Sequence, residues 1–198
     1  MKKKLIFATG NEGKMKEIRE ILGDLDYEIL SMKEAGVDVD IVEDGTTFEE
    51  NAEKKAVEIM KASGEAAIAD DSGLEIDFLD KQPGIHSARF LGHDTPYSIK
   101  NAKILDMLKD VPEEKRTARF VCAVCLALPD GRIIRSKGTL EGRIGNKITG
   151  ENGFGYDPIF FIPEKNCYSA ELSTEEKNKI SHRGKAMAEM REKILEIL

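Results

Sequence analysis

The chain has 198 residues, which is enough for one domain or for two closely packed lobes. Hydrophobic residues make up 40% of it, so a disordered polyampholyte is excluded in spite of the 34% of charged residues. Its 30 Lys and Arg against 37 Asp and Glu give a formal net charge of -7. A net anion is poorly suited to binding nucleic acid or an anionic membrane, so a polyanionic ligand needs a local basic pocket.

The sequence also predicts where the protein works. Its longest apolar run, Phe120 to Leu128, is about half of the roughly 20 residues that a membrane-spanning helix needs. The apolar stretch at the N-terminus is too short for a signal peptide. The three cysteines are too few for a disulfide framework, and Cys122 and Cys125 should face opposite sides of a strand and fill the core. We therefore expect a soluble, cytoplasmic protein.

The N-terminal part of the chain predicts a strand followed by two helices. Residues 4–8 form a short apolar strand, and after a turn the apolar positions recur every three or four residues until Gly23, as in an amphipathic helix. A second helix is expected to start near Thr46, because Thr46 and Glu49 match a capping box, and to end at residues 63–64.

The rest of the chain interleaves strands and helices without a strict βαβ rhythm, which indicates an α/β fold with a mixed sheet. Strands are predicted at 66–69, 74–78, 120–128, 132–135 and 158–162, helices at 97–108 and from Ser181 onward, and a glycine-rich loop at 138–155. No repeat, low-complexity tract or linker divides the sequence. We therefore expect one domain over residues 1–198.

The first candidate site lies between the first strand and the first helix, where the sequence reads Thr9-Gly10-Asn11-Glu12-Gly13-Lys14. A helix N-terminus attracts anions because its N–H groups lack intrahelical partners and carry a partial positive charge. Lys14 adds like charge to that end of the helix, and a bound phosphate would remove the conflict. The alternative is an Asn-capped helix with a solvated lysine.

The second candidate site is a set of acidic residues. Glu43 and Asp44 precede the second helix, and Asp70 and Asp71 lie between two predicted strands. Carboxylates where a strand meets a loop suit Mg²⁺, which prefers oxygen ligands. Adjacent residues of an extended chain point in opposite directions, so only one of the two aspartates should face a given site. The alternative is a pair of turn aspartates that cap the strand ends.

Two further segments carry polar and aromatic groups. The glycines beside Phe154 can expose its ring for stacking on a base, and Asp157 can accept hydrogen bonds from a base edge. The alternative for this segment is an aromatic turn that leads into a strand. Ser181 is expected to cap the last helix, which places His182 and Arg183 in its first turn as donors to a carbonyl oxygen or a phosphate. Here the alternative is an ordinary polar helix start.

The order and spacing of these segments closely resemble the inosine triphosphate pyrophosphatase family. The resemblance runs from residue 4 to the last helix and is carried by the segments TGNEGK, EDGTTFEENAEKKA, ADDSGL, PGIHSARF, FGYDPIF and EEKNKISHRGKA. It implies a long, twisted mixed sheet with helices in two lobes around a central substrate cleft, a homodimer and dependence on Mg²⁺. It also implies hydrolysis of XTP, ITP and dITP to the monophosphate and pyrophosphate, which removes deaminated purines from the nucleotide pool.

The resemblance also implies a role for each matched residue. Asp71 would be the proton acceptor, and Glu43 and Asp71 would hold Mg²⁺, with Asp44 and Glu49 near enough in sequence to compete with Glu43. The substrate-binding residues would be Thr9, Gly10, Asn11, Glu12, Gly13, Lys14, Lys54, Ser72, Phe154, Gly155, Tyr156, Asp157, Lys177, His182 and Arg183.

For release of pyrophosphate we expect water to attack the α-phosphorus, where negative charge must approach negative charge, so the barrier is mainly electrostatic. A 6-oxo purine accepts hydrogen bonds where adenine donates them, so buried donors such as His182 or Arg183 would select against adenine. Three other hypotheses remain at this stage: a Maf-type nucleotide pyrophosphatase with a different base preference, a nucleotide-binding module without catalysis, and a structural α/β domain.

Overall fold

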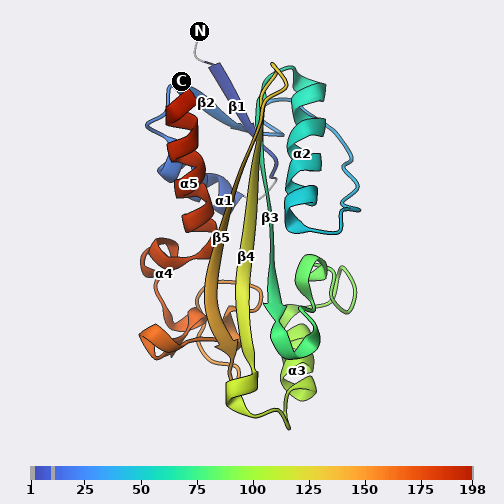
Figure 1. Ribbon diagram of the computed structural model, residues 1–198, viewed down its shortest axis with the longest axis vertical. Coiled ribbons are helices and arrows are strands. Elements are labelled where there is room, and N and C mark those ends of the chain that lie inside the picture. The colour runs from blue at the N-terminus through green and yellow to red at the C-terminus, as the bar shows by residue number, and fades with distance from the viewer. Residues whose placement is uncertain (1–2, 10–11, 198) are drawn as a thin grey trace. The chain divides into compact units, whose positions relative to one another are not determined.

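The computed structural model describes residues 3–9 and 12–197 (Figure 1). Its strands are β1 (Lys3–Phe7), β2 (Tyr27–Ser31), β3 (Ala66–Ile76), β4 (Thr117–Ala127), β5 (Ile133–Ile144), β6 (Phe160–Ile162) and β7 (Cys167–Tyr168). Its α-helices are α1 (Glu12–Leu22), α2 (Phe48–Ser63), α3 (Tyr97–Met107), α4 (Thr174–Ile180) and α5 (His182–Ile197). Several short 3₁₀ turns connect them.

The strands form one seven-stranded sheet in the order β2-β1-β3-β4-β5-β6-β7. Strand β1 pairs in parallel with both β2 and β3, whereas β6 pairs antiparallel with both β5 and β7. The sheet is therefore mixed, and the predicted α/β class is confirmed. The parallel pairing with β3 continues one residue beyond β1, where the Ala8 N–H donates to the Ile68 carbonyl oxygen at 2.9 Å.

The chain divides into two compact units. Unit 1 comprises Met1–Asp71, Cys122–Gly138 and Lys185–Leu198, and unit 2 comprises Ser72–Val121 and Thr139–Gly184. Strand β3 passes from unit 1 to unit 2 after Asp71. Each unit has a hydrophobic core formed from its own residues.

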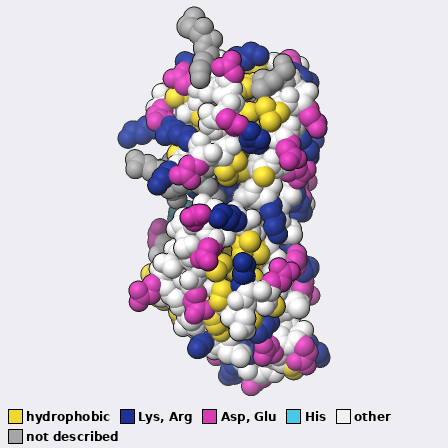
Figure 2. All heavy atoms as spheres, turned by 90° about the vertical axis from the view of Figure 1, so that its left-hand side faces the viewer, with side chains coloured by type: hydrophobic (Ala, Val, Ile, Leu, Met, Phe, Trp, Pro, Cys, Tyr) yellow, Lys and Arg dark blue, Asp and Glu magenta, His cyan; other side chains and the backbone are white. Residues whose placement is uncertain are grey.

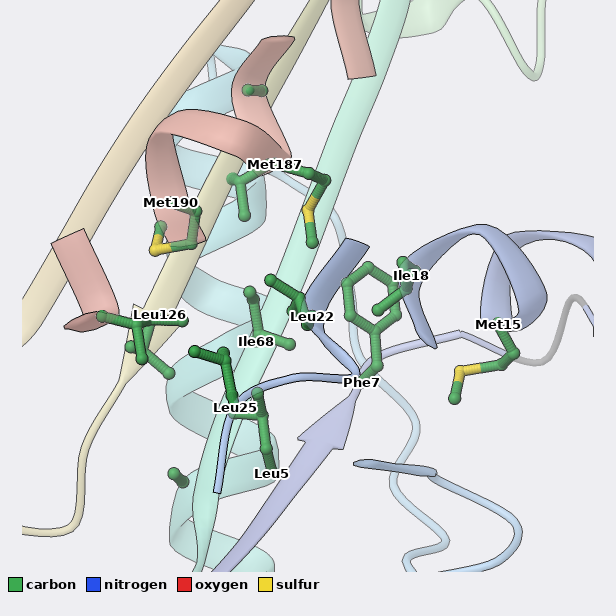
Figure 3. Close-up of a cluster of buried hydrophobic side chains, with 14 of the residues drawn as sticks. Leu5, Phe7, Met15, Ile18, Leu22, Leu25, Ile68, Leu126, Met187 and Met190 are labelled. Carbon is green, nitrogen blue, oxygen red and sulfur yellow. The ribbon is translucent and has the colours of Figure 1, made fainter. Parts of the chain in front are cut away.

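The core of unit 1 follows from the alternation of side chains along β1. Leu5 and Phe7 point to one face, where they pack with α1 and α5; Figure 3 shows Phe7 beside Ile18 of α1. Ile6 points to the other face and packs with Ile59 of α2 and with Ala67. Helix α2 accordingly lies on one side of β1, and α1 and α5 lie on the other (Figure 1).

The core of unit 2 combines aromatic packing with a buried guanidinium. The rings of Phe120 in β4 and Phe160 in β6 lie 4.5 Å apart between centroids. Arg116 is buried and donates to the carbonyl oxygens of Leu108, at the end of α3, and of Gly145, just beyond β5. The bond to Leu108 satisfies a carbonyl group that the helix end leaves without an intrahelical partner.

The cap predicted for α2 is one residue too early. The helix begins at Phe48, and the Thr47 side chain, not that of Thr46, accepts a hydrogen bond at 3.1 Å from the backbone N–H three residues later. That residue is Glu50 rather than Glu49, and its carboxylate accepts from the Thr46 N–H at 2.6 Å. The sequence has two adjacent threonines and two adjacent glutamates, so both registers fit the same pattern.

The strands also differ from the prediction. The two strand pieces at 66–69 and 74–78 are one strand, β3, so the two aspartates lie inside a strand and not in a loop. Strand β5 continues through the first part of the predicted loop at 138–155. Gly142 lies in this part of the strand and permits the close approach of β6, since a Cβ there would lie 2.5 Å from the Phe161 carbonyl oxygen. The strand predicted at 158–162 starts with a 3₁₀ turn. Strands β2 and β7 and helix α4 were not predicted.

The surface and the cysteines agree with a globular chain. Figure 2 shows acidic and basic side chains interspersed over the face it presents, so the net charge of -7 is not gathered there into one acidic block. Cys122 and Cys125 are buried free thiols, as predicted, and burial raises the pKa of Cys125 to about 12. Within the described part of the chain, no helix is long and apolar enough to cross a membrane.

Candidate active site

In unit 1 the candidate site begins at the end of β1, where strand, turn and helix meet. Thr9 follows β1, and α1 starts at Glu12 and contains Lys14; Gly10 and Asn11 lie outside the described residues. The ammonium of Lys14 contacts both carboxylate oxygens of Asp70, at 3.3 and 3.2 Å. Because ligands of open α/β sheets bind at the carboxyl ends of the strands, this is the expected edge for a substrate.

The neighbouring carboxylate of β3 faces a different partner. Asp70 contacts Lys14, whereas Asp71 accepts a hydrogen bond at 3.0 Å from the side-chain amide of Asn51 in α2. This divergence is the one expected from strand geometry. Asp70 is almost completely buried, with 2% of its side chain exposed, and the ion pair with Lys14 helps to compensate its charge.

The residues before α2 add a second acidic group to this site. Glu43 accepts a hydrogen bond from the Lys55 ammonium at 3.2 Å, and its negative charge raises the pKa of Asp71. The two carboxylates that could replace Glu43 as a metal ligand are paired with other lysines. Asp44 pairs with Lys54 at 2.5 Å, and Glu49 pairs with Lys137 at 2.6 Å. This arrangement favours Glu43 as the partner of Asp71.

Asp71 has an unusual carboxyl group. Burial raises its pKa to about 6, with further contributions in the same direction from the charges of Glu43 and Asp70. The positive charge of Lys55 and the hydrogen bond from Asn51 act in the opposite direction but are outweighed. A carboxylate with a pKa near neutrality is a suitable general base at physiological pH.

The acidic residues of unit 1 fit a magnesium ion. Among the residues that the structure describes, no group of three or more His, Cys, Asp and Glu is arranged to hold a metal. Magnesium in nucleotide enzymes takes one or two carboxylates and completes its shell with phosphates and water. Glu43 and Asp71 interact electrostatically within a partly buried region, which supplies such a pair of oxygen donors.

Unit 2 holds the aromatic candidate at the tip of a tight turn. The side chain of Phe154 is exposed (64%), between Gly153 and Gly155, which both have left-handed backbones with φ of 76° and 66°. The carboxylate of the buried Asp157 accepts a hydrogen bond from the Phe154 N–H at 2.9 Å. Its other oxygen accepts from the Ser169 hydroxyl at 2.8 Å. Asp157 therefore holds the turn that presents the ring.

Two cations of the C-terminal segment lie over this ring. The Lys177 ammonium lies 4.8 Å from the centroid of Phe154 and also pairs with Asp157. The Arg183 guanidinium lies 6.0 Å from the same centroid. His182 stacks on Phe120 with 5.1 Å between ring centroids. The structure thus brings these sequence-predicted residues together within unit 2.

The start of α5 has the predicted form. The Ser181 hydroxyl accepts a hydrogen bond from the Gly184 N–H at 2.9 Å, so it caps the helix, and His182 and Arg183 are buried in the first turn. The sharp passage from α4 to α5 requires a glycine, because a Cβ at Gly184 would lie 2.2 Å from the Asn178 carbonyl oxygen.

Other predicted residues have mainly supporting contacts. Tyr156 is buried and donates its hydroxyl to the Ser87 carbonyl oxygen at 2.7 Å, and the Gly155 carbonyl oxygen accepts from Asn101 at 3.0 Å. Ser72 is half-buried in β3, and Lys54 pairs with an exposed aspartate.

Sequence reasoning missed two residues of unit 1, Asn51 and Lys55. They lie four residues apart on one face of α2, and both act on Asp71. Helical periodicity could have pointed to both residues. Position 51 lies beside the apolar stripe of the helix although it is polar, and position 55 lies one turn later on the same face. The family resemblance pointed to Lys54, whereas Lys55 is the lysine whose charge lowers the pKa of Asp71.

Comparison with known proteins agrees with this geometry. A family model described as the Ham1 family matches residues 5–193. The chain belongs to the Ham1 family. This member is 48% identical over 195 residues to the dITP/XTP pyrophosphatase of Desulforamulus reducens, a match that covers 98% of this chain and 95% of the relative. It is 46% identical over 202 residues to the enzyme of the same name from Clostridium perfringens, covering 99% of each.

Solved structures of Ham1 relatives have the same fold. The Staphylococcus aureus Ham1 protein is similar with a TM-score of 0.92 and 38% identity, covering 99% of this chain and 100% of that one. The nucleoside-triphosphatase or dITP/XTP pyrophosphatase of Mycobacterium abscessus has a TM-score of 0.80 and 39% identity, covering 94% and 98%. The family resemblance inferred from the motifs is therefore confirmed.

Proposed function

We propose that this Ham1 protein hydrolyses deaminated purine nucleoside triphosphates, namely XTP, ITP and dITP, to the monophosphate and pyrophosphate. The observation that carries the proposal is the partly buried Asp71 carboxylate, which is held by Asn51 at 3.0 Å next to Asp70 of the same strand, the partner of Lys14. Its raised pKa of about 6 suits a general base. Near full-length relatives named dITP/XTP pyrophosphatase support the same reaction and do not favour a Maf-type enzyme.

In the proposed reaction water attacks the α-phosphorus, and negative charge builds on the leaving pyrophosphate. Asp71 orients this water and accepts its proton, a role usually worth about 10²–10⁴-fold in rate. Lys14 and Lys55 stabilise the charge of the triphosphate and of the leaving group. Glu43 and Asp71 are the residues that would hold Mg²⁺, which when bound supplies further neutralisation of the phosphates.

Unit 2 supplies the groups that recognise the base. The exposed ring of Phe154 offers a stacking surface for a purine, and Lys177 and Arg183 lie over the same ring. Arg183 or His182 donates to the 6-oxo group of hypoxanthine or xanthine. Adenine presents an amino group at that position, so it would leave a buried donor unpaired.

We also propose that the protein acts in the cytoplasm as a homodimer. The three free cysteines suit a reducing compartment, which is where a nucleotide-pool enzyme meets its substrates. Sedimentation or light scattering of the purified protein would test the dimer, with a monomeric mass contradicting it.

The proposed reaction is tested by product analysis. Purified protein with Mg²⁺ is incubated with XTP, dITP, dGTP, dATP and dTTP, and pyrophosphate and phosphate are measured separately. We expect pyrophosphate from XTP and dITP, and loss of activity with EDTA that returns with added Mg²⁺. Release of phosphate instead, or equal turnover of dATP, would contradict the proposal.

A further inference from the structure

Asn51 is a buried polar residue inside helix α2, where apolar residues are usual. It lies in the first turns of α2, with 1% of its surface exposed, next to the small apolar residues of the same helix. Asparagine has a lower helix propensity than alanine, and a buried amide is unfavourable unless its polar atoms are paired. Its contacts therefore decide what it does.

Both ends of the Asn51 amide have a defined partner. The side-chain oxygen accepts a hydrogen bond from the Gly45 N–H at 2.8 Å, and the side-chain nitrogen donates to the Asp71 carboxylate at 3.0 Å. The backbone N–H can only donate, so the oxygen must face Gly45 and the nitrogen must face Asp71. The amide orientation is thereby fixed by chemistry.

The loop before α2 packs closely against this amide. A Cβ at Gly45 would lie 2.6 Å from the Asn51 side-chain oxygen and 2.9 Å from Cβ of Glu50, so only glycine fits without a shift. Gly45 is two residues after Glu43, the acid that interacts with Asp71. One amide thus joins the loop that carries Glu43 to the strand that carries Asp71.

We propose that Asn51 is a positioning residue, which holds the Asp71 carboxylate at a fixed rotation and in a fixed relation to the 43–45 loop. The inference rests on the proposed function, in which Asp71 accepts the proton of the attacking water. The hydrogen bond from Asn51 restricts rotation of the carboxylate, since a turn about its Cβ–Cγ bond would break it. Asn51 has no contact with substrate in this scheme and acts through Asp71 alone.

The first test uses steady-state kinetics with dITP. Asn51→Leu removes both hydrogen bonds with a side chain of similar size, and we expect kcat to fall about 10- to 100-fold, as for other residues that support a catalytic group, with KM within about threefold. Ser63→Ala is the matched control, because Ser63 lies in the same helix and also makes one bond as donor and one as acceptor. Its kcat should stay at the wild-type value.

The second test does not depend on activity. Asn51→Asp keeps the acceptor for Gly45 but places a carboxylate against Asp71, so we expect a lower urea midpoint of the metal-free protein. Adding Asp71→Asn restores a donor–acceptor pair with reversed polarity, so it should raise the midpoint of Asn51→Asp by more than it raises that of the wild-type protein, while activity stays lost. If Asp71→Asn raises the midpoint of Asn51→Asp no more than it raises that of the wild-type protein, the inference is overturned.

These outcomes separate the inference from the function on which it rests. A wild-type protein that releases no pyrophosphate from dITP would refute the proposed function, while the stability of the reversed pair still tests the contact. Wild-type activity together with an unchanged kcat in folded Asn51→Leu would refute the positioning role alone. If Asn51→Leu does not fold, the Asn51→Asp and Asp71→Asn pair decides.

Discussion

The two candidate regions, one in each unit, differ in how their buried carboxyl groups are stabilised. In unit 1 the Asp71 carboxyl is partly buried near two other acids, and its pKa is raised, so ionisation there opposes folding. In unit 2 the buried Asp157 accepts from Phe154, Ser169 and Lys177, so its charge is well paired and supports the fold. We therefore expect the reactive group in unit 1, and we expect unit 2 to act as a rigid platform.

The largest expected effect is on catalysis in unit 1. Asp71→Asn keeps the shape of the side chain and can still accept from Asn51, but it removes the proton acceptor. We expect kcat for dITP to fall about 10²–10⁴-fold with little change in KM. Pyrophosphate release measures this directly, and a folded variant with normal turnover would remove Asp71 from the mechanism.

A stability measurement tests the paired charge of unit 2. Lys177→Met leaves the buried Asp157 without its cation, and the free energy of unfolding should fall by about 3 kcal/mol. Lys179→Met is the matched control in the same helix, since Lys179 pairs with Glu175 in an exposed position and contributes less than about 0.5 kcal/mol. Urea denaturation compares the two, and equal losses would show that the pair with Asp157 does not support the platform.

The raised pKa of Asp71 predicts a pH-dependent gain in stability on mutation. The folded-state pKa of about 6 lies above the ordinary value of 3.8, so the favourable contribution of protonated Asp71 is complete below about pH 4 and lost as the pH rises through 6. In EDTA, Asp71→Asn should therefore be more stable than wild type at pH 8, by up to about 3 kcal/mol.

The difference in the free energy of unfolding between Asp71→Asn and wild type should shrink towards pH 4. Chemical denaturation at a series of pH values checks both the size and the direction of this effect. A variant that is less stable than wild type at pH 8 would mean that ionised Asp71 is well compensated in the metal-free protein.

The smallest expected effect concerns the aromatic surface. Phe154→Ala should raise the KM for dITP about 5- to 150-fold, the range for loss of one base-stacking contact, with a smaller change in kcat. Phe78 is similarly exposed (51% against 64%) and lies outside the candidate site, so Phe78→Ala is the control and should leave KM unchanged. If both variants behave alike, Phe154 does not contact the base.

The sequence allowed the fold class and most of the long helices and strands to be predicted, because the spacing of apolar residues shows which face of each element is buried. It failed where two registers satisfy the same pattern, as with Thr46 and Thr47, and where polar residues lie inside a strand, as in the middle of β3. In the middle of β3, pairing with the neighbouring strands outweighs the tendency of the polar residues to form a turn. Short α4 and β2 give little periodic signal of their own.

The candidate site was predictable to a similar degree. Motif spacing predicted the carboxylates and an aromatic segment for the base. In the structure the charge of Glu43 acts on the pKa of Asp71 in unit 1, and Lys177 lies over the Phe154 ring in unit 2. The spacing did not reveal Asn51, because a supporting contact depends on which neighbours face each other in three dimensions.

The central claim is that Asp71 delivers water to the α-phosphorus of a deaminated purine triphosphate. Hydrolysis of dITP in water enriched in ¹⁸O, followed by mass spectrometry of both products, tests it most directly. The account predicts that the label enters dIMP and that pyrophosphate is unlabelled, with label incorporation slowed in Asp71→Asn. Label in pyrophosphate, or in free phosphate, would contradict it.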